Sequence, residues 1–281
     1  MQKEIMYIQK TFKTAYSLLR KYWKNMLVYA VPFILLHIIY FIFATIAYFG
    51  LYGGMFFVDI FHQIIAEGTW APLFILTLLL GIIAFLVLFI AASNFAKVMM
   101  NRVGYLTLKE IDIPLNMGSV VSLFKYAEEN FLQFFKLNIV ISASIIIGIL
   151  IFVFLGYILI FYVPWPSNLI LAVPLFILLL IAYLVFAAVT STAVILFFMG
   201  NEKKGVLALL KMGWGIFIHN VVEYILLHLA FFVIVFVYGV VMTVFFMVCT
   251  GPLEYILQLI FMFYIDMVFF VFVNFLKSKK R

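Results

Sequence analysis

The sequence predicts an all-α integral membrane protein with six transmembrane helices, and two observations carry this prediction. Of its 281 residues, 68% are hydrophobic and only 10% are charged, which leaves too little polar surface to coat a water-soluble domain. The charged residues are also grouped, so that six long apolar stretches remain between them. Because about 20 apolar residues cross a hydrocarbon core of roughly 30 Å, each stretch is long enough to span a bilayer.

The spans belong to a single predicted membrane domain, residues 1–281. A Lys-bearing segment, residues 1–25, precedes a first apolar run of full span length, so we expect this run to stay as a helix and not to be cleaved as a signal. Proline-containing breaks at 164–168 and 250–252 separate helices that no charge divides. The tail, residues 277–281, is basic. The predicted transmembrane helices comprise residues 26–50, 71–96, 137–162, 169–199, 221–248 and 252–276.

The distribution of Lys and Arg predicts the orientation. All 18 lie before residue 25, between residues 97 and 136, between residues 203 and 211, or in the tail, and these four segments share one face of a six-span protein. The loops of the opposite face carry Asp59, Glu67 and Glu254 and no basic residue. By the positive-inside rule we expect a multi-pass protein of the cell membrane with both termini in the cytoplasm. The single cysteine, Cys249, excludes an intramolecular disulfide.

A segment with helical periodicity precedes each odd-numbered span. In the first, apolar residues recur at intervals of three and four from Ile8 to Trp23, with lysines and Arg20 between them. We expect three interfacial amphipathic helices on the cytoplasmic surface, each with its apolar face against lipid. Their partners would be anionic lipid headgroups, because basic residues in the short connectors of so apolar a chain do not indicate nucleic acid. The predicted headgroup contacts are Lys13, Arg20, Lys21, Lys24, Lys125 and Lys211.

An Asn followed four residues later by an aromatic residue recurs where each amphipathic segment should bend into its span. The repeating unit would be an interfacial helix, a span and a returning span, used three times to give three helical pairs. Chance is the alternative, since 20% of the residues are aromatic. The three matches are Asn25 with Tyr29, Asn130 with Phe134, and Asn220 with Tyr224.

This layout resembles a known group of proteins. Residues 18–25 (Leu-Leu-Arg-Lys-Tyr-Trp-Lys-Asn) and 208–214 (Ala-Leu-Leu-Lys-Met-Gly-Trp) each end a short amphipathic segment before a span. The pattern is similar to that of prokaryotic six-span families of unknown function, including the membrane domain attached to some glycerophosphodiester phosphodiesterases. The resemblance covers most of the chain at the level of layout. It implies a fold and no activity, because we expect no soluble phosphodiesterase domain here.

Two ionisable residues lie near the middle of predicted spans, where a charge is costly to insert. Asp266 lies near the middle of the sixth span, and His37 near the middle of the first. Asp266 is either a proton or cation site that lines a cavity, or a buried carboxyl hydrogen-bonded to a neighbouring helix. His62, by contrast, is expected in an outer loop.

Glu223 begins the fifth span beside His219 and before His228. Because His219 and Glu223 are four residues apart, we expect them to share a helix face, as a proton relay or two metal ligands require. His228 lies well around the helix, so a three-ligand site would need a residue from elsewhere. A hydrogen-bonded polar cluster at the membrane entrance is the favoured interpretation, and neither a metal nor a cofactor is expected.

Other polar residues in the spans concentrate toward the cytoplasmic side. They either line a cavity open to the cytoplasm or join neighbouring helices by hydrogen bonds and close packing. We favour packing. These residues are Ser93, Asn94, Asn138, Ser142, Ser144, Thr190, Ser191 and Thr192.

Motifs for soluble chemistry are missing from the sequence. It contains no His-Glu-x-x-His, no phosphate-binding loop and no Gly-x-Ser-x-Gly. The leading hypothesis is therefore a non-enzymatic membrane subunit or scaffold that packs against other membrane proteins, copies of itself or lipid. The alternative is a small transporter of a lipid-like or apolar solute with Asp266 as its midplane site. An intramembrane enzyme that uses His219, Glu223 and His228 is the third hypothesis.

Overall fold

The fold consists of long helices joined by short connections. The computed structural model describes residues 2–66, 71–163, 167–248 and 252–279, and these residues form eight helices and no strand. Six of the described helices are long and apolar enough to cross a membrane, so the chain is a polytopic helical membrane protein, as predicted. The eight are α1 (Gln2–Lys21), α2 (Trp23–Ala66), α3 (Ala71–Leu108), α4 (Met117–Tyr162), α5 (Ser167–Phe198), α6 (Val206–Ile218), α7 (Val221–Val248) and α8 (Pro252–Lys279).

The first span was predicted to end at Gly50, but α2 continues to Ala66. The prediction that Asp59 and His62 lie in an outer loop is therefore wrong, because both belong to this helix. No proline lies between residues 33 and 66, and a glycine inside a helix lowers its stability without having to end it. Glu67, Cys249 and the turn residues 164–166 and 250–251 lie outside the described residues.

The predicted connector between the second and third spans is largely helical. Helix α3 continues to Leu108, and α4 begins at Met117, where Asn116 Oδ1 accepts a hydrogen bond from the Ser119 amide at 2.8 Å and caps the helix. The predicted second interfacial segment and the third span thus form one continuous helix. The prediction of a bend at Asn130 is wrong. The Asn130 side chain donates a hydrogen bond to Tyr126 O of its own helix at 2.9 Å and does not link α4 to another segment.

Helix breaks do occur in the first and third repeating units. The chain turns at Tyr22, between α1 and α2, three residues before Asn25. A second turn separates α6 from α7, where the Asn220 amide donates to Phe217 O at 2.9 Å. Two of the three predicted bends are therefore present, and the α4 segment lacks one.

Helix α1 lies against other helices of the chain. Its apolar stripe includes Ile8 and Ala15, which are buried where α1 meets α7 and α8. Phe12 packs edge-on against Phe231 of α7, with ring centroids 6.0 Å apart. The expectation that this stripe faces lipid is therefore wrong for these residues, because protein covers them.

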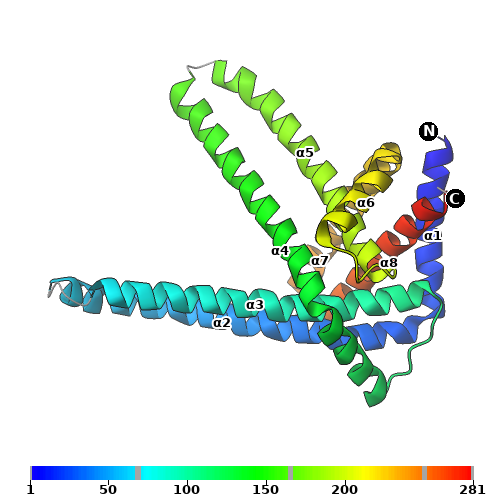
Figure 1. Cartoon of the computed structure of the whole chain (residues 1–281), viewed down its shortest axis with the longest axis horizontal. Helices are drawn as coiled ribbons and strands as arrows, with labels where there is room; N and C mark the ends of the chain where they lie inside the picture. Colours follow the sequence, from blue (N-terminus) through cyan, green and yellow to red (C-terminus); the bar gives the residue numbers. More distant parts are fainter. Residues whose placement is uncertain (1, 67–70, 164–166, 249–251, 280–281) are drawn as a thin grey trace.

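The buried residues gather at one end of the long helices. We call this end the base: residues 8–36, 93–137, 188–231 and 263–276, which contain every buried residue that the structure describes. In Figure 1 the α2–α3 hairpin and the α4–α5 hairpin diverge from the base. We call residues 142–184 of α4 and α5 the arm, and none of its described side chains is buried. The start of α1 and the end of α8 both lie at the base (Figure 1).

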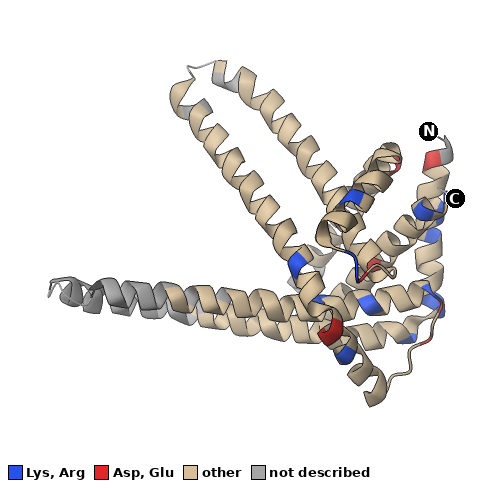
Figure 2. Cartoon of the chain, in the orientation of Figure 1, with Lys and Arg blue, Asp and Glu red and all other residues tan. Residues whose placement is uncertain are grey.

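Charge follows the same division. Figure 2 shows the Lys, Arg, Asp and Glu residues gathered around the base, whereas the arm carries none. The base thus combines the packed core with most of the polar chemistry of the chain, and candidate sites are to be found there.

Candidate functional site

Asn25 joins the α1–α2 bend to the segment that follows α3. Its side chain is fully buried; Nδ2 donates to Thr107 Oγ1 at 2.9 Å and to Ile111 O at 2.8 Å. Its Oδ1 accepts from the Ile113 amide at 2.8 Å. A buried polar group is tolerated when it is satisfied in this way, and here one side chain pairs with groups on two segments. This explains why the chain bends here and not at Asn130.

Glu110 reinforces the same junction from the surface. Its Oε2 lies 2.6 Å from Lys21 Nζ and accepts a hydrogen bond from the Tyr22 hydroxyl at 3.3 Å. The pKa of Glu110 is lowered, chiefly because Lys21 donates a hydrogen bond to the carboxylate, and the same bond raises the pKa of Lys21. Lys21 was predicted to contact lipid headgroups, but in the structure its ammonium is engaged by Glu110.

The aromatic residue of each repeating unit is a core anchor. Tyr29, Phe134 and Tyr224 are all among the largest fully or almost fully buried side chains. Their rings pack against aromatic rings of neighbouring helices: Phe263 for Tyr29, Phe197 and Phe198 for Phe134, and Phe272 for Tyr224. The repeat that the sequence indicated thus marks three packing positions in the base.

Asp266 lies on the face of α8 that meets α2. The Tyr29 hydroxyl donates to Asp266 Oδ2 at 2.6 Å, while the Tyr29 ring packs on Phe263, with centroids 4.8 Å apart. This pairing matches the interpretation of Asp266 as a carboxyl hydrogen-bonded to a neighbouring helix. The bond joins residues 237 positions apart in the chain, so it ties the first span to the last.

An apolar cavity of about 380 Å³ lies at the edge of the base, along the same α2–α8 contact. His37 lines it together with Phe33, Tyr255 and Leu259, whereas Asp266 does not. His37 Nδ1 lies 2.9 Å from Phe33 O, and the His37 and Tyr255 rings meet edge-on at 5.6 Å. The structure therefore separates the two midspan residues: Asp266 in a polar pair, His37 in an apolar wall.

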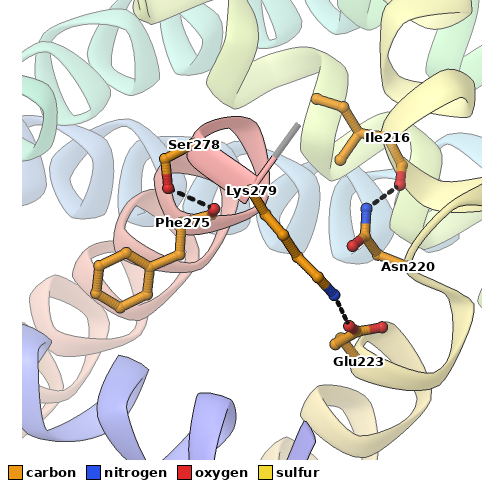
Figure 3. A network of polar contacts seen from close by, with 6 residues as sticks. All are labelled: Ile216, Asn220, Glu223, Phe275, Ser278 and Lys279. Atoms are coloured by element: carbon orange, nitrogen blue, oxygen red, sulfur yellow. Dashed lines mark hydrogen bonds and ion pairs between the residues drawn. The ribbon is translucent and has the colours of Figure 1, made fainter. Parts of the chain in front are cut away.

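Glu223 pairs with the end of α8, as Figure 3 shows. Its carboxylate Oε1 lies 2.6 Å from Lys279 Nζ, and the Glu223 side chain is only 7% exposed. Asn220, one turn earlier, donates to Ile216 O at 2.7 Å. The linear sequence contained no signal for Lys279 as the partner, since 56 residues separate the two.

The two histidines near Glu223 do not join it. The break between α6 and α7 places His219 at the end of one helix and Glu223 in the next. The prediction that they share a helix face is therefore wrong. His219 Nδ1 lies 2.7 Å from Gly215 O, and His228 Nδ1 lies 2.7 Å from Tyr224 O. Within the described ranges, no three residues of the types His, Cys, Asp and Glu come together as a metal site would need.

The polar residues that were predicted for the cytoplasmic half are mainly hydrogen-bonded within or between helices. Asn138 donates to Asn94 and so joins α4 to α3, and Thr192 is hydrogen-bonded to Tyr224, which joins α5 to α7. Others bond to carbonyls of their own helices. These are Ser93, Ser144, Thr190 and Ser191. The interpretation of these residues as links between and within helices agrees with this geometry.

The other predicted headgroup residues are exposed. Lys13 and Arg20 lie on α1, Lys24 at the start of α2, Lys125 on α4 and Lys211 on α6. Contact of these side chains with lipid headgroups stays a prediction.

Comparison of this chain with protein-family models, with curated proteins and with solved structures finds no match. The resemblance to six-span prokaryotic families therefore stays a prediction from the layout of the spans. The function has to be argued from the geometry of the base and the arm.

Proposed function

We propose that the chain is a non-enzymatic membrane subunit or scaffold that packs laterally against other membrane proteins through its diverging hairpins. One observation carries this proposal: every residue from 142 to 154 of α4 is exposed. These 13 residues cover all faces of the helix, whereas a helix inside a bundle buries at least one. The arm therefore offers complete helix surfaces that the chain itself does not use.

The arm also has positions where another helix can approach closely. Ser144 and Gly148 are one turn apart on α4, and a Cβ added at Gly148 would meet nothing within 4 Å. Lipid tails are as apolar as Leu, so helices associate in membranes through close packing at small residues and through polar bonds. The Ser144–Gly148 face has this character, and it supports lateral contact with a helix of a partner or of a second copy.

We place the base at the cytoplasmic face of the cell membrane. The concentration of Lys and Arg around the base supports this orientation, since cytoplasmic loops carry an excess of these residues. Both termini would then be cytoplasmic, and the exposed basic side chains would meet anionic headgroups.

The test compares Gly148→Ile with Val153→Phe, both on the arm. Val153 lies on the opposite face of α4 from Ser144, and both changes add bulk to an exposed position. After gentle solubilisation we expect wild type and Val153→Phe to retain a stoichiometric protein companion or a defined oligomer, measured by native mass spectrometry, and Gly148→Ile to lose it. Thermal unfolding of all three should coincide. A wild-type chain that is always a monomer with no reproducible companion would overturn the proposal.

The alternative proposal is a small transporter of an apolar or lipid-like solute. It is supported by the position of two features along the contact between α2 and α8. The Tyr29–Asp266 pair and the apolar cavity at His37 both lie on this contact. Asp266→Asn keeps the acceptor for Tyr29 and removes the ionisable group. If Asp266 couples transport, flux through reconstituted vesicles should lose its proton dependence in this variant, whereas unchanged flux removes the coupling role.

A further inference from the structure

A cavity of about 740 Å³ opens at the base beside α6. Three lysines from three separate segments line it: Lys204 in the connector between α5 and α6, Lys211 on α6 and Lys277 near the end of α8. Lys204 and Lys277, 73 positions apart in the chain, thus line the same cavity. Only the tertiary structure assembles this group, and only Lys211 was recognised from the sequence.

The lining of this cavity contains basic residues and no acidic ones. Among the described residues, neither Lys204 nor Lys211 forms an ion pair; Lys204 Nζ lies 3.4 Å from the sulfur of Met212. The acids of adjoining segments bind elsewhere, since Glu202 accepts from the Tyr126 hydroxyl at 3.1 Å and Glu223 holds Lys279. Like charges gathered this way favour a bound anion.

The rest of the lining is apolar. Leu196, Met212 and Ile216 form part of the wall, and on α6 the neighbouring Leu207 and Trp214 are 81% and 47% exposed. Exposed Trp and Leu beside basic residues are typical of a helix at the level of lipid headgroups. The site therefore combines a cationic part with an apolar part, as a molecule with an anionic head and an apolar body requires.

We propose that this cavity binds the phosphate group of an anionic phospholipid, with Lys204 and Lys211 at the phosphate and the start of the acyl chains on Met212 and Ile216. Free phosphate shares the head chemistry and is distinguished by the test. The site is independent of the lateral contacts proposed for the arm, so either proposal can fail without the other.

The experiment measures phosphatidylglycerol retained by the full chain in phosphatidylcholine nanodiscs, by native mass spectrometry. The double variant Lys204→Gln/Lys211→Gln leaves Lys277 in place. We expect each change to weaken retention about fivefold and the pair about 25-fold. The matched control, Lys13→Gln/Lys24→Gln, removes two exposed basic residues of the base outside the cavity and should retain the lipid. Equal losses in the two double variants would show diffuse attraction and overturn the cavity site.

A second variant tests whether the space of the cavity is needed in addition to its positive charge. Ala208→Trp fills the space from an exposed position and keeps all three lysines, so we expect loss of the retained lipid with an unchanged unfolding temperature. Retention as in the wild type would overturn the proposal, as would equal retention of phosphatidylglycerol and phosphatidylcholine. Competition with inorganic phosphate, against chloride at the same ionic strength, distinguishes the two ligands. If phosphate displaces the lipid, the site binds free phosphate and the phospholipid proposal is overturned. If the lipid stays bound, the site binds the phospholipid.

Discussion

The base and the arm are built from the same kinds of residue but differ in packing. Phe197 and Phe198 are fully buried in the base, whereas Phe152 and Phe154 in the arm are 46% and 62% exposed. Hydrophobicity does not explain this difference, because all four residues are Phe and lipid solvates all four rings equally well. Apolar character therefore places helices in the membrane without deciding which of them touch.

The features that distinguish the base are polar bonds and close approaches. Asn25 and the Tyr29–Asp266 pair link segments that are distant in the chain. A Cβ added at Gly213 of α6 would lie 2.6 Å from Val189 O of α5, so these two helices meet almost at the backbone. In lipid these are the interactions that hold helices together, and the described part of the arm beyond Ser144 shows no such link between its two helices.

The largest contrast is expected between Phe134→Ala and Phe152→Ala. Phe134 is 2% exposed and packs on Phe197 and Phe198, so its truncation leaves a cavity and should cost about 3 kcal/mol of unfolding free energy. Phe152→Ala in the arm should change it by less than about 0.5 kcal/mol. Chemical unfolding in mixed micelles measures both. Similar losses would mean that the arm is as tightly packed as the base.

The next effect concerns the Asn25 junction. Asn25→Ala removes hydrogen bonds to Thr107, Ile111 and Ile113 and should cost about 2 kcal/mol, because buried partners lose their bonds. Asn130→Ala is the control, since Asn130 bonds only to a carbonyl of its own helix. Amide exchange at residues 107–113 should rise in the first variant alone. Equal stability of the two variants would remove Asn25 as the cause of the bend.

A smaller difference is expected between two glycines. Gly213→Ala forces α5 and α6 apart and should cost about 1 kcal/mol or somewhat more. Gly148→Ala in the arm meets nothing within 4 Å and should be neutral or slightly stabilising, because Ala favours a helix over Gly. Thermal unfolding of the two variants distinguishes them, and a destabilised Gly148→Ala would contradict the open surface of the arm.

The smallest effect belongs to the exposed Lys21–Glu110 pair, whose partners are 59% and 58% exposed. The pKa of Glu110 is lowered in the folded chain, so its contribution is present above the ordinary value of 4.5 and is lost as the pH falls through the folded pKa. The raised pKa of Lys21 means that its contribution is present below 10.5 and is lost at higher pH.

Wild type should therefore exceed Glu110→Gln in stability between about pH 5 and pH 10 and converge with it outside this window. Added salt should shrink the difference, since an exposed pair is screened. Glu129→Gln on α4 is the control with an exposed acid outside the junction. A pH-independent difference would show that the carboxylate charge plays no part.

Sequence reasoning recovered the elements that depend on local composition. The spans 169–199, 221–248 and 252–276 agree with α5, α7 and α8 within a few residues, because apolar length and proline breaks are local properties. It did not predict the full lengths of the 44-residue α2 and of α4. Charged residues suggested that these helices end or bend where they in fact continue. It identified Asp266 and Glu223 as residues needing an explanation, but it did not find their partners, Tyr29 of α2 and Lys279 of α8, which lie on other helices.

The sequence by itself determined that this chain is a six-span helical membrane protein, since hydropathy and charge act residue by residue. The tertiary structure alone decided that the helices pack at one end, that Asn25 fixes one bend, and that three lysines surround one cavity. The physical reason is that lipid accepts every apolar face of a helix alike. Which faces meet depends on close packing and on polar pairs between distant segments, and these exist only once the helices are assembled.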